Sequence, residues 1–281
     1  MNKPLTFLLS LILLVSIPVS AQKIDVLTYN IRYASFDKGP SNWDTRKEGV
    51  FAILKSHDFV GLQEVLPVQM EDINKKLGNE YGYLFRTREA DPAKGEGSPI
   101  LYNKSKWKVT SSGFLWLSDT PETPGTNTWG AAFNRILSYG IFSSVISGDS
   151  ILVINTHFDH ISQSAREKSI DLILNRFKSY FSKMPVVFMG DLNVTPDNQV
   201  YMKITTTSVL KDSFKKIHPN ESIAGATFHG WKPEVKPVDR IDYVFISPFL
   251  EVKKSEVLRN KFNANYPSDH FPVHSLLIFK K

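Results

Sequence analysis

Short apolar runs rich in Val, Ile, Phe and Tyr recur along most of this chain, and they constrain its fold more than any other feature. Their lengths and their content of β-branched residues predict β-strands. The runs are Ile24–Tyr33, Phe59–Val65, Ile100–Asn103, Lys106–Leu117, Ile136–Ile146, Ile151–His157, Val186–Asp191, Arg240–Ile246 and Phe271–Phe279. Composition is ordinary for a globular protein, with 42% hydrophobic and 22% charged residues, which excludes a disordered chain, a collagen and a coiled coil.

Helical spacing of apolar residues occurs in fewer places. The pattern predicts helices over Arg46–Lys55 and Val68–Leu77, and most clearly over Ala165–Phe181. Many strands with few helices indicate two packed sheets with helices outside, a layered α/β domain. The alternative, a doubly wound parallel sheet, requires a helix after nearly every strand. Residues 100–157 hold strand-like runs without a helical pattern, which favours antiparallel pairing there.

Two segments between the predicted strands read as long loops. Asp119–Asn134 contains Pro and Gly at several positions, and Lys215–Val238 is rich in Pro, Gly and His. Long loops in a compact domain tend to shape a binding site.

The amino-terminal residues have the pattern of an export signal. Lys3 precedes a short apolar core, and Val19-Ser20-Ala21 resembles a cleavage site. We therefore expect residues 1–21 to be a signal peptide and residues 22–281 to form one exported domain, periplasmic or secreted. A retained membrane anchor is the weaker interpretation, because the apolar stretch is short and is interrupted by Ser and Pro. We expect a monomer with no stable membrane anchor.

Charge and cysteine content narrow the chemistry. The chain has no cysteine, which excludes disulfides, a thiol nucleophile and a thiolate metal site. Its net charge of +6 suits an anionic partner but does not identify one.

Polar residues lie at or near the ends of several predicted strands. Strands end in Asn30, in Glu64, in His157 with Asp159, and in Asp191 with Asn193, whereas Asp242 lies within the run Arg240–Ile246, and Asp269 with His270 precedes the last strand. Burying a carboxylate beside Val, Ile and Phe costs several kcal/mol unless the carboxylate is paired or binds a cation. The repetition of this pattern predicts a shared cavity where the strand ends converge.

The residue types in this set point to phosphoester hydrolysis. Asparagine and carboxylate oxygens are the ligands that Mg²⁺ or Mn²⁺ prefers. His157 and His270 are suited to act as acid, base or charged donor to a phosphate oxygen. No phosphate-binding Walker loop is present in the sequence, which disfavours nucleotide-dependent transfer.

Each motif taken alone also has a structural explanation. Asn30 is compatible with a strand end or turn, and Glu64 with a surface position at a helix start. The Gly190–Asn193 segment suits a turn followed by a cap. Arg240 and Asp242 suit a cross-strand ion pair, and Asp269 an Asx turn before an edge strand. The functional interpretation fails only if all these explanations hold together.

Six motifs, in this order, resemble the endonuclease/exonuclease/phosphatase superfamily, whose members are deoxyribonuclease I-like. They are Thr28-Tyr29-Asn30-Ile31-Arg32, Gln63-Glu64-Val65, Asn155-Thr156-His157-Phe158, Gly190-Asp191-Leu192-Asn193, Arg240-Ile241-Asp242-Tyr243 and Ser268-Asp269-His270-Phe271-Pro272-Val273. The resemblance covers residues 24–279 and implies a four-layered α/β sandwich with two central mixed β-sheets. Three further motifs, Asn42-Trp43-Asp44, Trp116–Pro121 and Tyr266–Asp269, look like the exported bacterial branch of metal-dependent hydrolases.

The resemblance also implies a role for each matching residue. Glu64 matches the principal magnesium ligand, and Asn30 and Asp269 match residues that complete or support the metal site. Asp191 matches the aspartate that orients or deprotonates the attacking water, and Asn193 the asparagine that binds the phosphate. His270 matches the histidine that contacts the phosphate, and Asp242 matches the aspartate that orients that histidine. His157 matches the second active-site histidine, and Arg135 matches, more weakly, a phosphate-binding arginine.

The implied reaction is in-line attack by water on a phosphate ester, with Mg²⁺ or Mn²⁺ as cofactor and one or two ions. Three functions remain open. A phosphodiesterase or phosphatase acting on a small molecule or lipid headgroup is favoured, a secreted nuclease is the alternative, and a non-catalytic binding module is disfavoured because every expected position is occupied. A nuclease usually needs a basic track, and the lysine groups near residues 104–108, 211–216 and 253–261 also fit solvated faces.

Overall fold

Two β-sheets form the centre of the molecule in this computed structural model, which describes residues 22–34, 37–220, 225–232 and 240–280. The first sheet contains β1 (Lys23–Asn30), β2 (Phe59–Gln63), β3 (Tyr81–Leu84), β4 (Ile100–Asn103), β11 (Leu250–Val257) and β12 (Val273–Phe279). The second contains β5 (Trp107–Trp116), β6 (Ile136–Ser144), β7 (Ser150–His157), β8 (Val186–Asp191), β9 (Lys211–Asp212) and β10 (Asp242–Ile246).

Each sheet is mixed. The strand orders are β11-β12-β1-β2-β4-β3 and β5-β6-β7-β8-β10-β9. Strands β1 and β2 are parallel, as are β7 and β8, and the other neighbours pair antiparallel. The strands β5, β6 and β7 follow one another as antiparallel neighbours, which confirms the pairing expected between residues 100 and 157.

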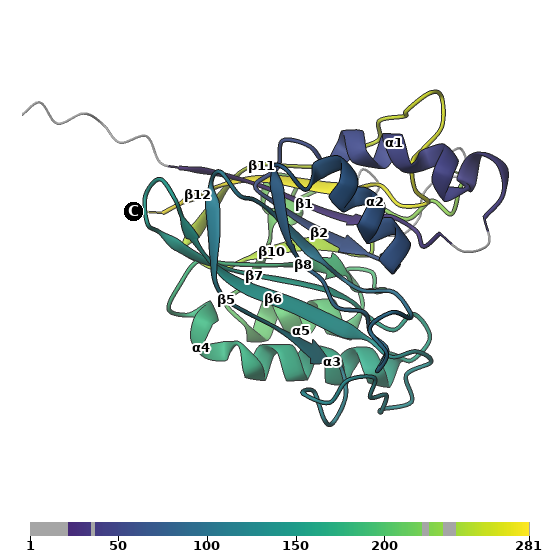
Figure 1. Ribbon diagram of the computed structural model, residues 1–281. Coiled ribbons are helices and arrows are strands. Elements are labelled where there is room, and N and C mark those ends of the chain that lie inside the picture. Colours follow the sequence, from purple (N-terminus) through teal and green to yellow (C-terminus); the bar gives the residue numbers. More distant parts are fainter. Residues whose placement is uncertain (1–21, 35–36, 221–224, 233–239, 281) are drawn as a thin grey trace, which may run out of the picture.

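Helices cover the outer faces of both sheets (Figure 1). Helices α1 (Trp43–Leu54) and α2 (Pro67–Leu77) lie on the first sheet, and α3 (Gln163–Arg176), α4 (Lys178–Phe181) and α5 (Gln199–Thr207) lie on the second. A short 3-10 helix, η1 (Gly39–Ser41), precedes α1, and α6 (Ser213–Ile217) packs near β10 and β11. The predicted four-layered sandwich with two mixed sheets is therefore confirmed.

Three apolar cores hold these layers together. One core lies between the sheets and includes Val26, Phe59 and Val153. The other two lie between each sheet and the helices that cover its outer face. In β1 the alternate residues Ile24 and Val26 enter the core between the sheets, whereas Leu27 and Tyr29 enter the core under α1 and α2. Burial on both faces explains why this strand reads as a nearly continuous apolar run.

Several predicted boundaries differ from the structure. The run expected over Ile24–Tyr33 ends as a strand at Asn30, and the helix expected over Ala165–Phe181 is divided into α3 and α4 at Phe177. The loop expected over Lys215–Val238 begins inside α6, and residues 221–224 and 233–239 of it lie outside the described part of the chain. The elements β3, β9, β11, α5 and α6 were not predicted from the sequence.

The described residues contain no helix that is long and apolar enough to cross a membrane. Residues 1–21, the predicted signal peptide, lie outside the described part of the chain.

Candidate active site

The carboxyl ends of the two parallel strand pairs meet at one end of the sandwich. Asn30 ends β1 and Glu64 follows β2 in the first sheet, while His157 ends β7 and Asp191 ends β8 in the second. A cavity of about 830 Å³ opens there. The predicted site residues that line it are Glu64, Arg135, His157, Asp191, Asn193, Asp269 and His270. Strands distant in sequence thus bring the predicted residues together, as the strand-end pattern anticipated.

Asn30 connects two of these carboxylates. Its amide nitrogen donates hydrogen bonds of 3.0 Å to Oε1 of Glu64 and 3.0 Å to Oδ2 of Asp191, and its side-chain oxygen accepts from the backbone N–H of Arg32. The other oxygen of Glu64 accepts from the backbone N–H of Tyr33 at 3.1 Å. Asn30 therefore orients the carboxylates from beneath the cavity, and direct metal ligation by Asn30 stays a prediction.

Glu64 and Asp269 are the two carboxylates of the predicted metal set. Both line the cavity, and burial raises the pKa of Asp269, with the neighbouring Glu64 charge adding to that rise. Neighbouring carboxylates repel each other unless a cation lies between them. Their oxygen donors fit Mg²⁺ or Mn²⁺, so the residues present suit the implied cofactor.

Asp191 has an environment suited to a general base. Its side chain is fully buried, and burial raises its pKa to about 7, with the charge of Asp242 adding to the rise and His270 opposing it. A base works best with a pKa near the operating pH. Asp191, Asp242 and His270 also bring carboxylate oxygens and a ring nitrogen within 4.8 Å of one another, so the three groups interact strongly.

His270 is held as a cation by Asp242. Its Nδ1 donates to Oδ2 of Asp242 at 2.9 Å, and its Nε2 lies 3.8 Å from Oδ2 of Asp191. Burial lowers the pKa of His270, but the charge and hydrogen bond of Asp242, with the charges of Asp191 and Asp269, together outweigh burial and raise the pKa to about 10. Among the described residues, Oδ1 of Asp242 has no hydrogen-bond partner. The pair therefore presents a positive imidazolium N–H beside the cavity, next to Asp191.

His157 is a neutral histidine that Asn193 orients. The amide nitrogen of Asn193 donates to Nε2 of His157 and to the carbonyl of Phe158, both at 3.0 Å. Because Nε2 accepts, the proton of the ring sits on Nδ1, 3.7 Å from Oε1 of Glu96. Burial first, and Arg135 next, keep the pKa of His157 well below its usual range. Both amide hydrogens of Asn193 are thus engaged, and its predicted donation to a phosphate stays a prediction.

Arg135 is buried in the cavity wall among opposite charges. Its Nη1 lies 3.5 Å from Oε1 of Glu96, its Nε lies 3.7 Å from Oδ2 of Asp159, and its Nη2 contacts Nδ1 of His160 at 3.1 Å. Arg135 lines the cavity, and its predicted contact with a phosphate stays a prediction.

Other charged residues in the lining were not predicted from the sequence. Arg32, Arg88, Glu96 and His160 line the cavity, and Arg88 donates to Oε1 of Glu96 at 2.5 Å. Glu96 lies between two glycines in a loop, without an apolar strand before it, so the strand-end criterion missed it.

Strained backbone also marks this region. Arg32, Glu64 and Asn193 have φ angles of 57°, 62° and 50°, in the left-handed region that non-glycine residues rarely adopt. Gly190 has φ 146°, and a Cβ added there would lie 2.0 Å from the carbonyl oxygen of Thr156. Such strain persists where the surrounding structure fixes it, and it often occurs at functional sites.

Comparisons with known proteins agree with this architecture. The model of the Endonuclease/Exonuclease/phosphatase family matches residues 27–270, a range that contains all the predicted site residues. The chain is 24% identical to the probable CCR4-Not complex 3'-5'-exoribonuclease subunit Ccr4 of Vairimorpha ceranae, over 90% of this chain. It spans 63% of that protein and 34% and 42% of two other Ccr4 relatives.

Two solved structures from Bacteroides thetaiotaomicron are similar along nearly their whole length. One is an endonuclease/exonuclease/phosphatase family protein, with a TM-score of 0.86 and 31% identity over 93% of this chain and 100% of that chain. The other is a mannosyl-6-phosphatase, with a TM-score of 0.84 and 32% identity over 91% of this chain and 100% of that chain.

Proposed function

The chain belongs to the endonuclease/exonuclease/phosphatase family, and on that premise we propose that it is a metal-dependent hydrolase of small-molecule phosphate esters. The observation that carries this proposal is the cavity, whose lining combines the carboxylates of Glu64 and Asp269 with a candidate base and an imidazolium. A phosphorylated sugar is the substrate that we favour, with a lipid headgroup as a second substrate of the same kind.

Glu64 and Asp269 are the residues that would hold the divalent cation, with Asn30 orienting Glu64. A bound Mg²⁺ or Mn²⁺ supplies positive charge that stabilises the phosphoryl oxygens as negative charge develops on them. The role of this chain's own residues follows from their contacts and does not depend on the number of ions.

The proposed reaction is attack by water on phosphorus. A new bond forms between the water oxygen and phosphorus, the ester P–O bond breaks, and the leaving oxygen takes up a proton from solvent and departs as the alcohol. Asp191, which is buried and has a pKa near neutrality, accepts the proton of the attacking water. His270 places its charged N–H against an oxygen of the phosphate, and Asp242 keeps that ring protonated and oriented.

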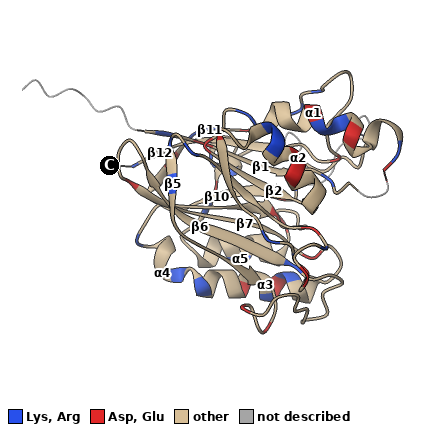
Figure 2. Ribbon diagram, viewed as in Figure 1, with Lys and Arg blue, Asp and Glu red and all other residues tan. Residues whose placement is uncertain are grey.

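The distribution of charge favours a small substrate. Among the described residues, the permanent cations that line the cavity are Arg32, Arg88 and Arg135, and no described lysine lines it. Lys106 forms an ion pair of 2.6 Å with Asp58, which directly precedes β2. The cavity lies beyond the opposite end of β2, so this lysine is distant from it. Helices α1 and α2 carry both signs of charge (Figure 2). A polynucleotide normally requires a continuous basic track, so these positions support a compact ester.

The similar mannosyl-6-phosphatase adds a specific candidate, a sugar 6-phosphate. The Ccr4 relatives supply the competing hypothesis, a ribonuclease. One feature of the cavity is compatible with both hypotheses: Phe133, which is exposed, stacks on His160 with ring centroids 5.6 Å apart. An exposed aromatic surface at a cavity can stack on a base, and it can equally stack on a sugar ring.

A substrate panel separates these hypotheses. The purified protein, with Mg²⁺ or Mn²⁺, is incubated with mannose 6-phosphate, bis-p-nitrophenyl phosphate, sphingomyelin, RNA and plasmid DNA. We expect the sugar phosphate to be hydrolysed fastest, and we expect Asp191→Asn to lower turnover by about 10² to 10⁴-fold. Rapid cleavage of RNA or DNA would make the nuclease the leading function. Equal turnover by wild type and Asp191→Asn would refute the proposed site.

We also propose that residues 1–21 are removed on export, so that residues 22–281 act as a monomer in the periplasm or outside the cell. The support is the pattern of the amino-terminal residues alone. Mass spectrometry of the protein from a periplasmic or culture-medium fraction is expected to find Gln22 at the amino terminus. A chain that retains Met1 and stays in the cytoplasm would contradict the proposal.

A further inference from the structure

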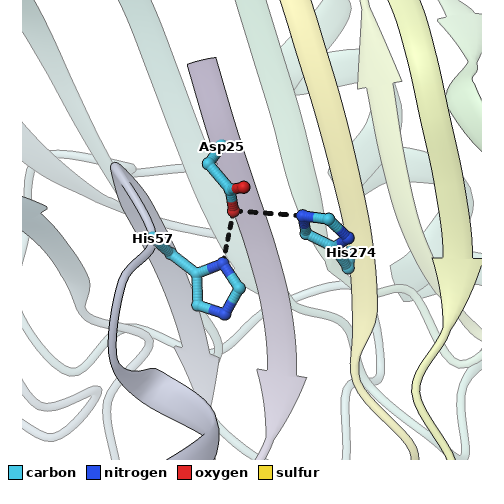
Figure 3. A group of neighbouring side chains, drawn as sticks. All are labelled: Asp25, His57 and His274. Carbon is cyan, nitrogen blue, oxygen red and sulfur yellow. Dashed lines mark hydrogen bonds and ion pairs between the residues drawn. The ribbon is translucent and has the colours of Figure 1, made fainter. Parts of the chain in front are cut away.

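A second cluster of metal-ligating side chains lies at the other end of β1 from the cavity. Asp25 comes from the start of β1, His57 from the segment between α1 and β2, and His274 from β12 (Figure 3). At about 3.3 Å per residue the stretch from Asp25 to Asn30 spans roughly 16 Å. The cluster is therefore separate from the catalytic carboxylates.

The fold places these side chains on one face. Leu27 pairs with His274 across the antiparallel strands β1 and β12, so Asp25 and His274 are diagonal neighbours on the same face of the sheet. Oδ1 of Asp25 contacts both Nδ1 of His57 and Nε2 of His274, the latter at 3.1 Å. The ligand atoms of the three residues all lie within 4.8 Å of one another.

In each histidine ring the inward nitrogen contacts Asp25, and the other, outward nitrogen has a hydrogen-bond acceptor as its partner. Nε2 of His57 lies 3.0 Å from the carbonyl oxygen of Ile53, and Nδ1 of His274 lies 3.2 Å from Oε1 of Glu256. A carbonyl and a carboxylate only accept, so both outward nitrogens carry hydrogen. This pairing of the outward N–H with a carbonyl or carboxylate is the arrangement that orients metal-ligating histidines.

The inward atoms therefore require positive charge between them. In a neutral imidazole whose outward nitrogen is protonated, the inward nitrogen presents a lone pair. Here two such nitrogens face a carboxylate oxygen that is also only an acceptor. The convergence is stable only if both rings gain a second proton or if one cation binds between the three atoms.

We propose that Asp25, His57 and His274 bind one transition-metal dication, of which Zn²⁺ is the best fit. Two imidazole nitrogens and one carboxylate oxygen suit Zn²⁺, whereas Mg²⁺ and Ca²⁺ prefer oxygen ligands alone. The side chains are 27%, 12% and 12% exposed, so an ion can enter and water can complete the coordination. The ion would tie β12 and the segment after α1 to β1, in a chain without cysteine for disulfides.

Zn²⁺ binding to the purified protein tests this proposal. Calorimetric titration with Zn²⁺ at about pH 8, in excess Mg²⁺, measures affinity and stoichiometry under conditions where ordinary histidines are neutral. We expect His274→Ala and the size-conserving His274→Gln to lose one equivalent of Zn²⁺ or to bind it at least 100-fold more weakly. Glu256→Gln, which changes only the partner of His274, is expected to weaken binding by about 10- to 100-fold.

Two control variants locate the ion. Glu64→Gln alters the cavity and is expected to keep the Zn²⁺ equivalent that the His274 variants lose. His218→Ala removes a histidine that contacts the carbonyl of Ser255, outside the cluster, and is expected to bind like wild type. Circular dichroism confirms that each variant is folded.

The results that overturn the proposal are equally definite. If folded His274→Gln binds Zn²⁺ with the affinity and stoichiometry of wild type, the cluster is not the site. If wild type binds no Zn²⁺ beyond what Glu64→Gln removes, protons alone hold the cluster together. Phosphate release by His274→Gln in excess Mg²⁺ is a separate readout, because it reports on the proposed function and not on this site.

Discussion

Asn155 provides the sharpest test of how the two sheets are held in register beneath the cavity. This residue belongs to β7 in the second sheet, and its side chain is completely buried. Its amide nitrogen donates to the carbonyl oxygens of Leu62 and Pro99, both at 2.8 Å, and its side-chain oxygen accepts from Nε2 of Gln63 at 2.8 Å. These partners belong to β2 or lie directly before β4, so one side chain joins the sheets between His157 and Glu64.

The substitution Asn155→Leu removes all of these hydrogen bonds at nearly constant volume. A hydrogen bond contributes about 1 kcal/mol net, so the loss amounts to about 3 kcal/mol. In the variant, the carbonyl of Pro99 still accepts from the backbone N–H of Leu62 at 3.0 Å, and the side-chain amide of Gln63 still donates to Oγ1 of Thr28 at 3.0 Å. These remaining hydrogen bonds limit the further cost of unpaired groups. We therefore expect the melting temperature to fall by roughly 6–12 °C.

Thermal and urea unfolding of the purified variant measure this loss. Asn265→Leu is the matched control, because Asn265 is exposed and, within the described part of the chain, its side chain makes a single hydrogen bond, to the carbonyl of Asn263. We expect the control to change the free energy of unfolding by less than about 0.5 kcal/mol. A loss below about 1 kcal/mol for Asn155→Leu would refute the idea that this residue bridges the sheets.

Three further predictions concern the site, the backbone and pH. Asp242→Asn removes a charge-assisted hydrogen bond to His270 worth about 1.5–3 kcal/mol, so kcat is expected to fall by about 10- to 100-fold. Combining it with His270→Gln is expected to cause no additional loss of kcat, and additive losses would show that Asp242 does not act through His270. Gly190→Ala forces a Cβ to within 2.0 Å of the carbonyl oxygen of Thr156 at φ 146°, so urea unfolding is expected to show a loss of roughly 3 kcal/mol or more, and an unchanged midpoint would contradict this. Burial lowers the pKa of His274, but hydrogen bonds to two carboxylates outweigh burial and raise this pKa above 6.5. The stabilisation that protonated His274 gives the folded protein is therefore complete below pH 6.5 and is lost as the pH rises through the folded-state pKa. In metal-free protein the difference in melting temperature between wild type and His274→Gln should therefore shrink from about pH 6 to about pH 9, and a constant difference would refute the assignment.

The sequence predicted the central strands well because they are buried on both faces. β4 and β8 match their predicted bounds, and β8 is buried along its whole length. β11 was missed because Lys253 and Lys254 interrupt its apolar pattern, with exposed side chains on an edge strand. Charged residues on an edge strand face solvent and discourage pairing with other chains, so the apolar run that identifies a strand is absent there.

The strand-end pattern located most of the cavity but not its loop residues. Asp191 and His157 follow apolar runs, whereas Glu96 and Arg88 come from a loop whose path no local pattern predicts. The cluster at Asp25 shows the same limit, because Asp25 and His274 are 249 residues apart and only the pairing of β1 with β12 brings them together.

Hydrolysis in water enriched in ¹⁸O tests the central claim most directly. If water attacks phosphorus with Asp191 as base, one labelled oxygen enters the released phosphate and none enters the alcohol. We expect that result for a sugar phosphate in the presence of Mg²⁺ or Mn²⁺, with release suppressed by a chelator and by Asp191→Asn. Label in the alcohol, or no hydrolysis of any phosphate ester with either ion, would contradict the account.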